Sequence, residues 1–142
     1  MSKKPKTGFQ LVLIDTAPLY ALADRQDADH DRALKVFKGL SLEGNVTLQI
    51  PAPVVFELHR LRLYRKPFEP GAALLEIKQI LQRFPIAHPE TTDFDVALEQ
   101  LGRFPDQRIT LADGVTASMA GRLEARVFTF DRHFLLLGAE LV

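Results

Sequence analysis

Two aspartates stand at positions in this sequence where they could hold a divalent cation. Asp15 directly follows the apolar run Phe9–Ile14, and Asp131 directly follows the segment Arg126–Phe130. Both segments are typical of buried strands, and the carboxyl ends of parallel strands form one ligand-binding edge. Two aspartates at that edge would repel each other unless a cation such as Mg²⁺ or Mn²⁺ lay between them. The alternative is that each only caps a following helix.

Glu57 and Asp113 lie in stretches that carry little other charge. Glu57 is at the margin of the apolar stripe of a predicted helix over 53–65, where a carboxylate needs a partner or a metal. Asp113 is the only charged residue in 109–120, so its burial is costly unless it is paired. The alternatives are an ion pair between Glu57 and Arg60, and a first-turn position for Asp113, where the helix dipole favours a carboxylate.

A basic cluster follows Glu57 along the same predicted helix. It contains the residues that we expect to contact RNA: Arg60, Arg62, Tyr64, Arg65 and Lys66. Arginine and lysine would bind phosphates, and the tyrosine ring would stack on a base of single-stranded RNA. The alternative is a solvated helix face. Phe56 and Leu63 lie away from the apolar stripe and are candidates for contact with a second subunit.

The elements that must position these residues alternate between strands and helices. Strands are predicted at 9–14, 46–50, 84–88 and 126–130, with a final extended segment at 140–142. Helices are predicted at 18–23, 28–40, 53–65, 71–83, about 91–103 and 110–123, with a short helical turn after Asp131. We expect Thr16 to cap the first helix and Thr91 or Thr92 to cap the fifth. This alternation predicts an α/β fold with a mostly parallel sheet.

Composition restricts the class of protein. The 142 residues include 18 basic and 18 acidic side chains and no cysteine. Thiolate metal sites and cysteine nucleophiles are therefore excluded, and strong non-specific nucleic-acid binding is disfavoured. No apolar run is long enough to span a membrane, and no secretory signal is recognisable, so a cytoplasmic location is the default. Residues 1–8 are expected to be a disordered basic tail, and 9–142 a single domain.

Other kinds of site find little support in the sequence. There is no glycine-rich phosphate loop and no Gly-x-Ser-x-Gly nucleophile motif. A phosphotransfer site would need a lysine from a late strand or helix, and every lysine lies at or before Lys78. A catalytically silent module that binds RNA or a protein is the main alternative to an enzyme.

Four motifs in this order resemble those of the PIN-domain nucleases, in particular the VapC-like toxins of toxin–antitoxin pairs. They are Leu-Val-Leu-Ile-Asp-Thr-Ala-Pro-Leu around Asp15, Pro-Val-Val-Phe-Glu-Leu around Glu57, Leu-Ala-Asp-Gly-Val-Thr-Ala-Ser-Met-Ala around Asp113, and Val-Phe-Thr-Phe-Asp-Arg-His-Phe around Asp131. The resemblance extends from Phe9 to Val142.

This resemblance implies a three-layer α/β/α fold, a homodimer, an antitoxin partner and cleavage of RNA with Mg²⁺ or Mn²⁺. It implies that Asp15 and Asp113 are central metal ligands and that Glu57 and Asp131 complete the cluster. Thr16 and Thr129 would orient these carboxylates. The sequence departs from the family at Thr116 and Ala117, where some members carry a further aspartate, and in its longer basic N-terminal segment.

Overall fold

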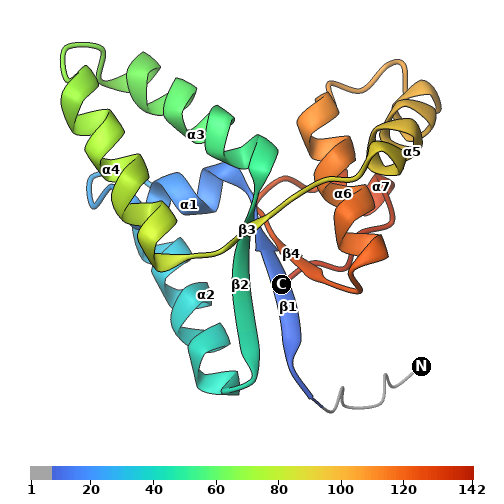
Figure 1. Ribbon diagram of the computed structural model, residues 1–142, viewed down its shortest axis with the longest axis horizontal. Coiled ribbons are helices and arrows are strands. Elements are labelled where there is room, and N and C mark those ends of the chain that lie inside the picture. Colours follow the sequence, from blue (N-terminus) through green and yellow to red (C-terminus); the bar gives the residue numbers. More distant parts are fainter. Residues whose placement is uncertain (1–7) are drawn as a thin grey trace.

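The computed structural model describes residues 8–142 and arranges them as a parallel sheet between two helical layers (Figure 1). The strands are β1 (Gln10–Ile14), β2 (Val46–Pro51), β3 (Ile86–Ala87) and β4 (Arg126–Phe128), in the spatial order β3-β2-β1-β4. The helices are α1 (Thr16–Ala23), α2 (His30–Glu43), α3 (Ala52–Arg65), α4 (Pro70–Arg83), α5 (Thr91–Gly102), α6 (Leu111–Arg122) and α7 (His133–Leu136). All strand pairings are parallel, which confirms the predicted fold class.

The sheet is buried on both faces because β1 is apolar throughout its second half. Val12 and Ile14 belong to one core cluster with residues of α1, α2 and α3, and Leu13 belongs to a second cluster with residues of α5 and α6. All three side chains are fully buried. Since β1 is an interior strand, the residue that follows it is delivered to the middle of the sheet edge. Within residues 8–142, no helix has both the length and the apolar character that crossing a membrane requires.

Several predicted boundaries differ from the observed ones for local reasons. Strand β3 is shorter than predicted, because Phe84 N–H still donates to Ile80 O at the end of α4 and Pro85 has no N–H. Strand β4 stops at Phe128, and the segment 140–142 adds only a single bridge, between Leu141 and Val127. The predicted tail, residues 1–8, lies outside the described residues apart from Gly8.

Two predicted helix caps are wrong. Helix α1 begins at Thr16, and Asp15 occupies the N-cap position without a side-chain cap bond. Helix α5 has Glu90 as its N-cap, which forms a capping box with Asp93. Thr16 is therefore the first helical residue of α1, and its hydroxyl is available for another contact.

Close packing of α5 and α6 fixes the position of Asp113. A Cβ on Gly114 would lie 3.0 Å from the Cβ of Ala97, so the two helices approach too closely there for a larger residue. Asp93 in α5 is buried and accepts hydrogen bonds from Ser118 Oγ at 2.8 Å and Arg122 Nη2 at 2.8 Å, both from α6. These bonds hold α5 and α6 together. The carboxylate of Asp113, which belongs to α6, is therefore held in a fixed position relative to α5.

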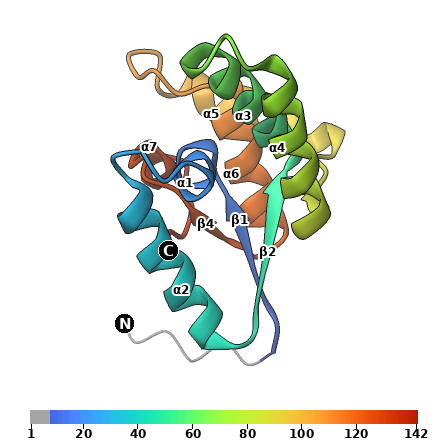
Figure 2. The same ribbon diagram turned by 90° about the vertical axis from the view of Figure 1, so that its left-hand side faces the viewer.

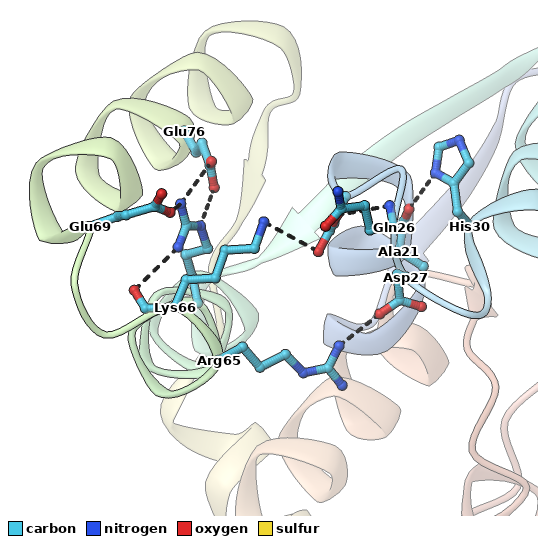
Figure 3. Close-up of polar contacts among 10 residues, drawn as sticks. Ala21, Gln26, Asp27, His30, Arg65, Lys66, Glu69 and Glu76 are labelled. Carbon is cyan, nitrogen blue, oxygen red and sulfur yellow. Dashed lines mark hydrogen bonds and ion pairs between the residues drawn. The ribbon is translucent and has the colours of Figure 1, made fainter.

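The C-terminal end of α3 is held by ion pairs on two sides (Figure 3). Arg62 is only 5% exposed and donates from Nε to Glu76 Oε2 at 2.7 Å and from Nη2 to Glu69 Oε2 at 3.0 Å. Arg65 Nη1 donates to Asp27 Oδ2 at 2.7 Å, in the loop between α1 and α2. The helix that carries Glu57 is thus tied to both α4 and the α1–α2 loop.

We expect Arg62→Ala to lower the free energy of unfolding by about 2 kcal/mol, since it removes charge-assisted hydrogen bonds and the packing of a buried side chain. Chemical denaturation measures this loss. The matched control is Arg103→Ala, because Arg103 pairs with Glu99 on the surface, and there we expect less than about 0.5 kcal/mol. Equal losses in the two variants would show that Arg62 does not stabilise the α3–α4 contact.

Candidate active site

Asp15 and Asp131 are joined by one threonine. Thr129 Oγ1 donates to Asp15 Oδ2 at 2.8 Å and accepts a hydrogen bond from the Asp131 backbone N–H at 3.0 Å. Asp15 N–H also donates to Phe128 O at 2.9 Å, so the ends of β1 and β4 are fastened together. Asp15 is 7% exposed. The two aspartates therefore meet at the carboxyl edge of the sheet, as their positions after the strands predict.

Glu57 enters the site from the second turn of α3. Its Oε2 accepts a hydrogen bond from Thr16 Oγ1 at 2.8 Å, across 41 positions of sequence. No ion pair to Arg60 is present among the described residues, so the local alternative for Glu57 does not apply. Thr16 lies directly after Asp15, and the contact places Glu57 beside that aspartate.

Asp113 completes the capping box of α6 and is also a member of the acidic cluster. It is the third residue of α6 and forms a capping box with Thr110, whose Oγ1 accepts from Asp113 N–H at 3.1 Å. Thr110 N–H in turn lies 3.4 Å from Asp113 Oδ2. The two interpretations of this residue, structural and functional, are compatible because the capping geometry itself holds the carboxylate in place.

Electrostatics show that the four carboxylates form one cluster. Burial, followed by repulsion from Asp15 and Asp131, raises the pKa of Asp113 to about 6. Burial also raises the pKa of Asp15, with smaller contributions from Glu57 and Asp131. The pKa of Glu57 is raised by burial and by Asp113. Each of these three groups is thus harder to ionise than usual, which is the behaviour of carboxylates crowded together without a cation.

The donor set fits a hard divalent cation. The cluster offers only carboxylate oxygens. Hydroxyls hold Asp15 and Glu57, and no arginine or lysine of residues 8–142 pairs with either carboxylate. Within residues 8–142, no group of three or more histidine, cysteine, aspartate or glutamate side chains is arranged to hold a metal ion directly. A cation here would therefore take water among its ligands, as Mg²⁺ commonly does.

The predicted RNA contacts divide into two groups. Arg60 and Tyr64 are exposed, whereas Arg62 is buried against Glu69 and Glu76 and is not available to RNA. Arg65 pairs with Asp27 and packs over the Tyr20 ring at 4.5 Å, and Lys66 Nζ lies 3.6 Å from Asp24 Oδ2. The prediction for Arg62 is wrong, because its acidic partners come from α4 (Glu76) and the residue before it (Glu69) and cannot be identified from the local sequence.

Sequence reasoning missed His133 as a neighbour of the cluster. Its backbone N–H donates to Asp131 Oδ1 at 2.8 Å, and its Nδ1 lies 3.2 Å from the same oxygen. The contact is a local turn two residues after Asp131, so the spacing Asp-x-His after a strand was the available signal. His133 contributes the one imidazole in contact with a cluster carboxylate in the described part of the chain.

The comparisons with known proteins agree with this fold. The family model described as PIN domain matches residues 12–139. The solved structure of VapC20 from Mycobacterium tuberculosis, described as a sarcin–ricin loop cleaving toxin, has a TM-score of 0.74 and 18% identity, with 92% of this chain and 98% of that chain covered.

Two further solved structures give similar values. VapBC2 from Rickettsia felis, bound to a DNA fragment from its promoter, has a TM-score of 0.71, 17% identity and coverage of 94% and 98%. FitAcB from Neisseria gonorrhoeae has a TM-score of 0.71, 20% identity and coverage of 92% and 95%. At these identities the likeness is one of fold. No curated protein matches by sequence.

The raised pKa of Asp113 predicts a dependence of stability on pH. Between pH 3.8 and about 6 the folded chain holds a proton on Asp113 that the unfolded chain has lost, so stability falls as the pH rises through this window. We expect Asp113→Asn to remove that loss and, in EDTA, to raise the melting temperature at pH 7.5 by roughly 3 to 6 °C. Differential scanning fluorimetry measures this effect.

The advantage of Asp113→Asn should disappear below about pH 4, where the wild-type carboxyl is protonated in both states. Asp106→Asn, at an exposed loop residue, is the control that removes the same charge elsewhere. A variant no more stable than the wild type at pH 7.5 would contradict the crowding of the cluster.

Proposed function

This chain belongs to the PIN domain family, and on that premise we propose that it is a metal-dependent endoribonuclease and the toxin of a toxin–antitoxin pair. The observation that carries the proposal is the cluster of Asp15, Glu57, Asp113 and Asp131. Burial and crowding raise the pKa values of Asp15, Glu57 and Asp113, and no arginine or lysine of residues 8–142 pairs with these three carboxylates. The fold shared with VapC20, whose structure is described as that of an RNA-loop-cleaving toxin, supports RNA as the substrate.

In this proposal Asp15 and Asp113 are the central ligands of Mg²⁺ or Mn²⁺, and Glu57 and Asp131 complete the site, some through water. A bound cation would supply a water of lowered pKa and would offset negative charge on the scissile phosphate. Thr129 holds one oxygen of Asp15, and Thr16 holds one oxygen of Glu57, which restricts the rotation of both side chains.

The RNA path would run along α3 from the acidic cluster. Residues three and seven positions apart lie on one face of a helix, so Arg60 and Tyr64 share the face of Glu57. Arg60 would bind a phosphate and Tyr64, 84% exposed, would stack on a base. Arg65 and Lys66 take part less directly, because they hold the α1–α2 loop through Asp27 and Asp24.

Two protein partners belong to the proposal. The antitoxin is inferred from the motifs that resemble those of VapC-like toxins of toxin–antitoxin pairs, together with the fold shared with VapBC2 and FitAcB. A homodimer is inferred from large apolar side chains exposed on α3 and α5, namely Phe56, Phe94 and Leu98. Large apolar side chains exposed in this way are candidates for burial in an interface between two protein chains. Because RNA is the proposed substrate, the proposed location is the cytoplasm.

The decisive experiment is cleavage of a mixed pool of structured and single-stranded RNAs, with Mn²⁺ or with EDTA. We expect fragments from the wild type with Mn²⁺ only, and a loss of at least roughly 100-fold in Asp15→Asn, because a central ligand is neutralised. Asp95→Asn, at an exposed residue of α5, should cleave like the wild type. RNA that is bound but never shortened would favour the silent binding module instead.

A second prediction concerns the RNA path. We expect Arg60→Ala to raise KM for RNA several-fold with little change in kcat, because the lost phosphate contact forms in the ground state as well as in the transition state. Steady-state kinetics at two salt concentrations measure the effect, which should shrink at high salt. Arg103→Ala removes a similar charge from the residue that follows α5 and is the control. An unchanged KM in Arg60→Ala would exclude this path.

A further inference from the structure

Part of one edge of the sheet is not covered by a neighbouring strand. Strand β3 pairs with β2 only at Ile50 and Pro51, whereas Val46 to Gln49 pair with β1 on the other side. Figure 2 shows this half of β2 with α2 to one side and no further strand beside it. It is the N-terminal half of β2, so it lies at the opposite end of the sheet from the carboxylate cluster.

The exposed backbone groups can be assigned from the hydrogen bonds at each end of β2. Ile50 N–H donates to Pro85 O at 2.9 Å, and Gln10 N–H donates to Asn45 O at 2.8 Å. Alternate residues of a strand turn their N–H and C=O to the same side, so Val46 and Leu48 face the same way as Ile50, away from β1. No strand partner for these groups exists in the described part of the chain.

Pro85 is the residue that leaves this edge open. If the ladder between β2 and β3 continued, the N–H at position 85 would donate to Leu48 O, and proline has none. The preceding amide, that of Phe84, is used at the end of α4 by its bond to Ile80 O. An unpaired strand edge of this kind accepts an extended peptide as an additional strand.

A groove of about 340 Å³ lies beside the open edge. Its walls include Phe37 and Leu40 of α2 and Phe84 after α4, and the two phenylalanine rings meet edge to face at 6.4 Å. The side chains of Val46 and Leu48 lie on the face of β2 that packs against the core, whereas the side chain of Thr47 lies on the exposed face. An added strand would therefore need apolar side chains at alternate positions, facing the groove, and polar ones between them.

Arg83 gives the groove a charge preference. It lines the groove, is exposed, and contacts the ring of Phe84 at 6.0 Å, and no carboxylate among residues 8–142 pairs with it. The N-terminal segment of this chain carries Lys3, Lys4 and Lys6 and has the wrong charge to occupy the groove. An acidic side chain is the complementary group.

We infer that the open edge of β2 binds an extended segment of a partner protein, with alternating apolar side chains in the groove and an acidic side chain on Arg83. This surface is distinct from the carboxylate cluster, and the inference goes beyond the proposed nuclease without depending on its activity. Main-chain hydrogen bonds to Val46 and Leu48 would supply affinity, and the groove and Arg83 would supply selectivity.

The test uses the full chain labelled with ¹⁵N and an acetylated and amidated peptide, Ser-Val-Thr-Leu-Ser-Val-Ser-Asp, with a second peptide that ends in Lys instead of Asp. At saturating acidic peptide we expect amide hydrogen exchange of Val46 and Leu48 to slow by at least roughly tenfold. The Thr47 amide faces β1, so it should already be protected and its exchange rate should not change.

We expect Arg83→Glu to weaken binding of the acidic peptide at least roughly tenfold and to favour binding of the lysine peptide. Arg103→Glu should leave both affinities unchanged.

Three results would overturn the inference. The first is no slowing at Val46 and Leu48, or equal slowing by the acidic and basic peptides. The second is protection of both amides in the free chain that increases with protein concentration, which would assign the edge to a second copy. The third is protection in the free chain that disappears when residues 1–7 are removed, which would assign the edge to the chain's own N-terminal segment.

Discussion

Burial of mutually repelling carboxylates at one edge of the sheet is the constraint on which the rest of this structure depends. Asp15, Glu57 and Asp113 all have raised pKa values because they are partly buried and close to one another. Such a cluster opposes folding, so the surrounding chain must hold it together. Hydrogen bonds hold each of these carboxylates in place. Thr129 donates to Asp15, Thr16 donates to Glu57, and Asp113 is held in the capping box with Thr110. Each donor is a hydroxyl or a backbone N–H, which stabilises a carboxylate without supplying the positive charge that would make a cation unnecessary.

Helix α3 links the acidic cluster to the rest of the helical layer. Its first turns carry Glu57, and its last turn carries Arg62 and Arg65, which are held by acidic residues of α4 and the α1–α2 loop (Figure 3). The basic residues at the end of α3, which together resemble a nucleic-acid contact, therefore differ in how far they are buried. The side chains that face the core or the neighbouring loop stabilise the fold, and those that share the face of Glu57 remain exposed.

The sequence was sufficient for the fold class, the order of the elements and the convergence of the four acidic residues. Buried strands have continuous apolar runs, and strand ends fix where Asp15 and Asp131 must lie. Partners that are distant in the chain could not be found in this way. The contact between Thr16 and Glu57 spans 41 positions, and that between Thr129 and Asp15 spans 114. Neither leaves a local pattern, and only the family resemblance implies that Thr16 and Thr129 orient carboxylates. Arg62 is wrongly predicted as an RNA contact for a similar reason, because its partners Glu69 and Glu76 are brought to it by the packing of the following segment.

The spread of the cluster along the chain has a consequence for synthesis. Asp15, Glu57, Asp113 and Asp131 come from four separate segments, and Thr129, which holds Asp15, belongs to the last of them. A growing polypeptide on the ribosome has β1 and β2 long before β4, and until β4 emerges Asp15 lacks both its hydroxyl donor and its neighbour Asp131. The cluster can therefore form only after β4 has been synthesised. A chain truncated before Thr129 lacks both the hydroxyl that holds Asp15 and the carboxylate of Asp131.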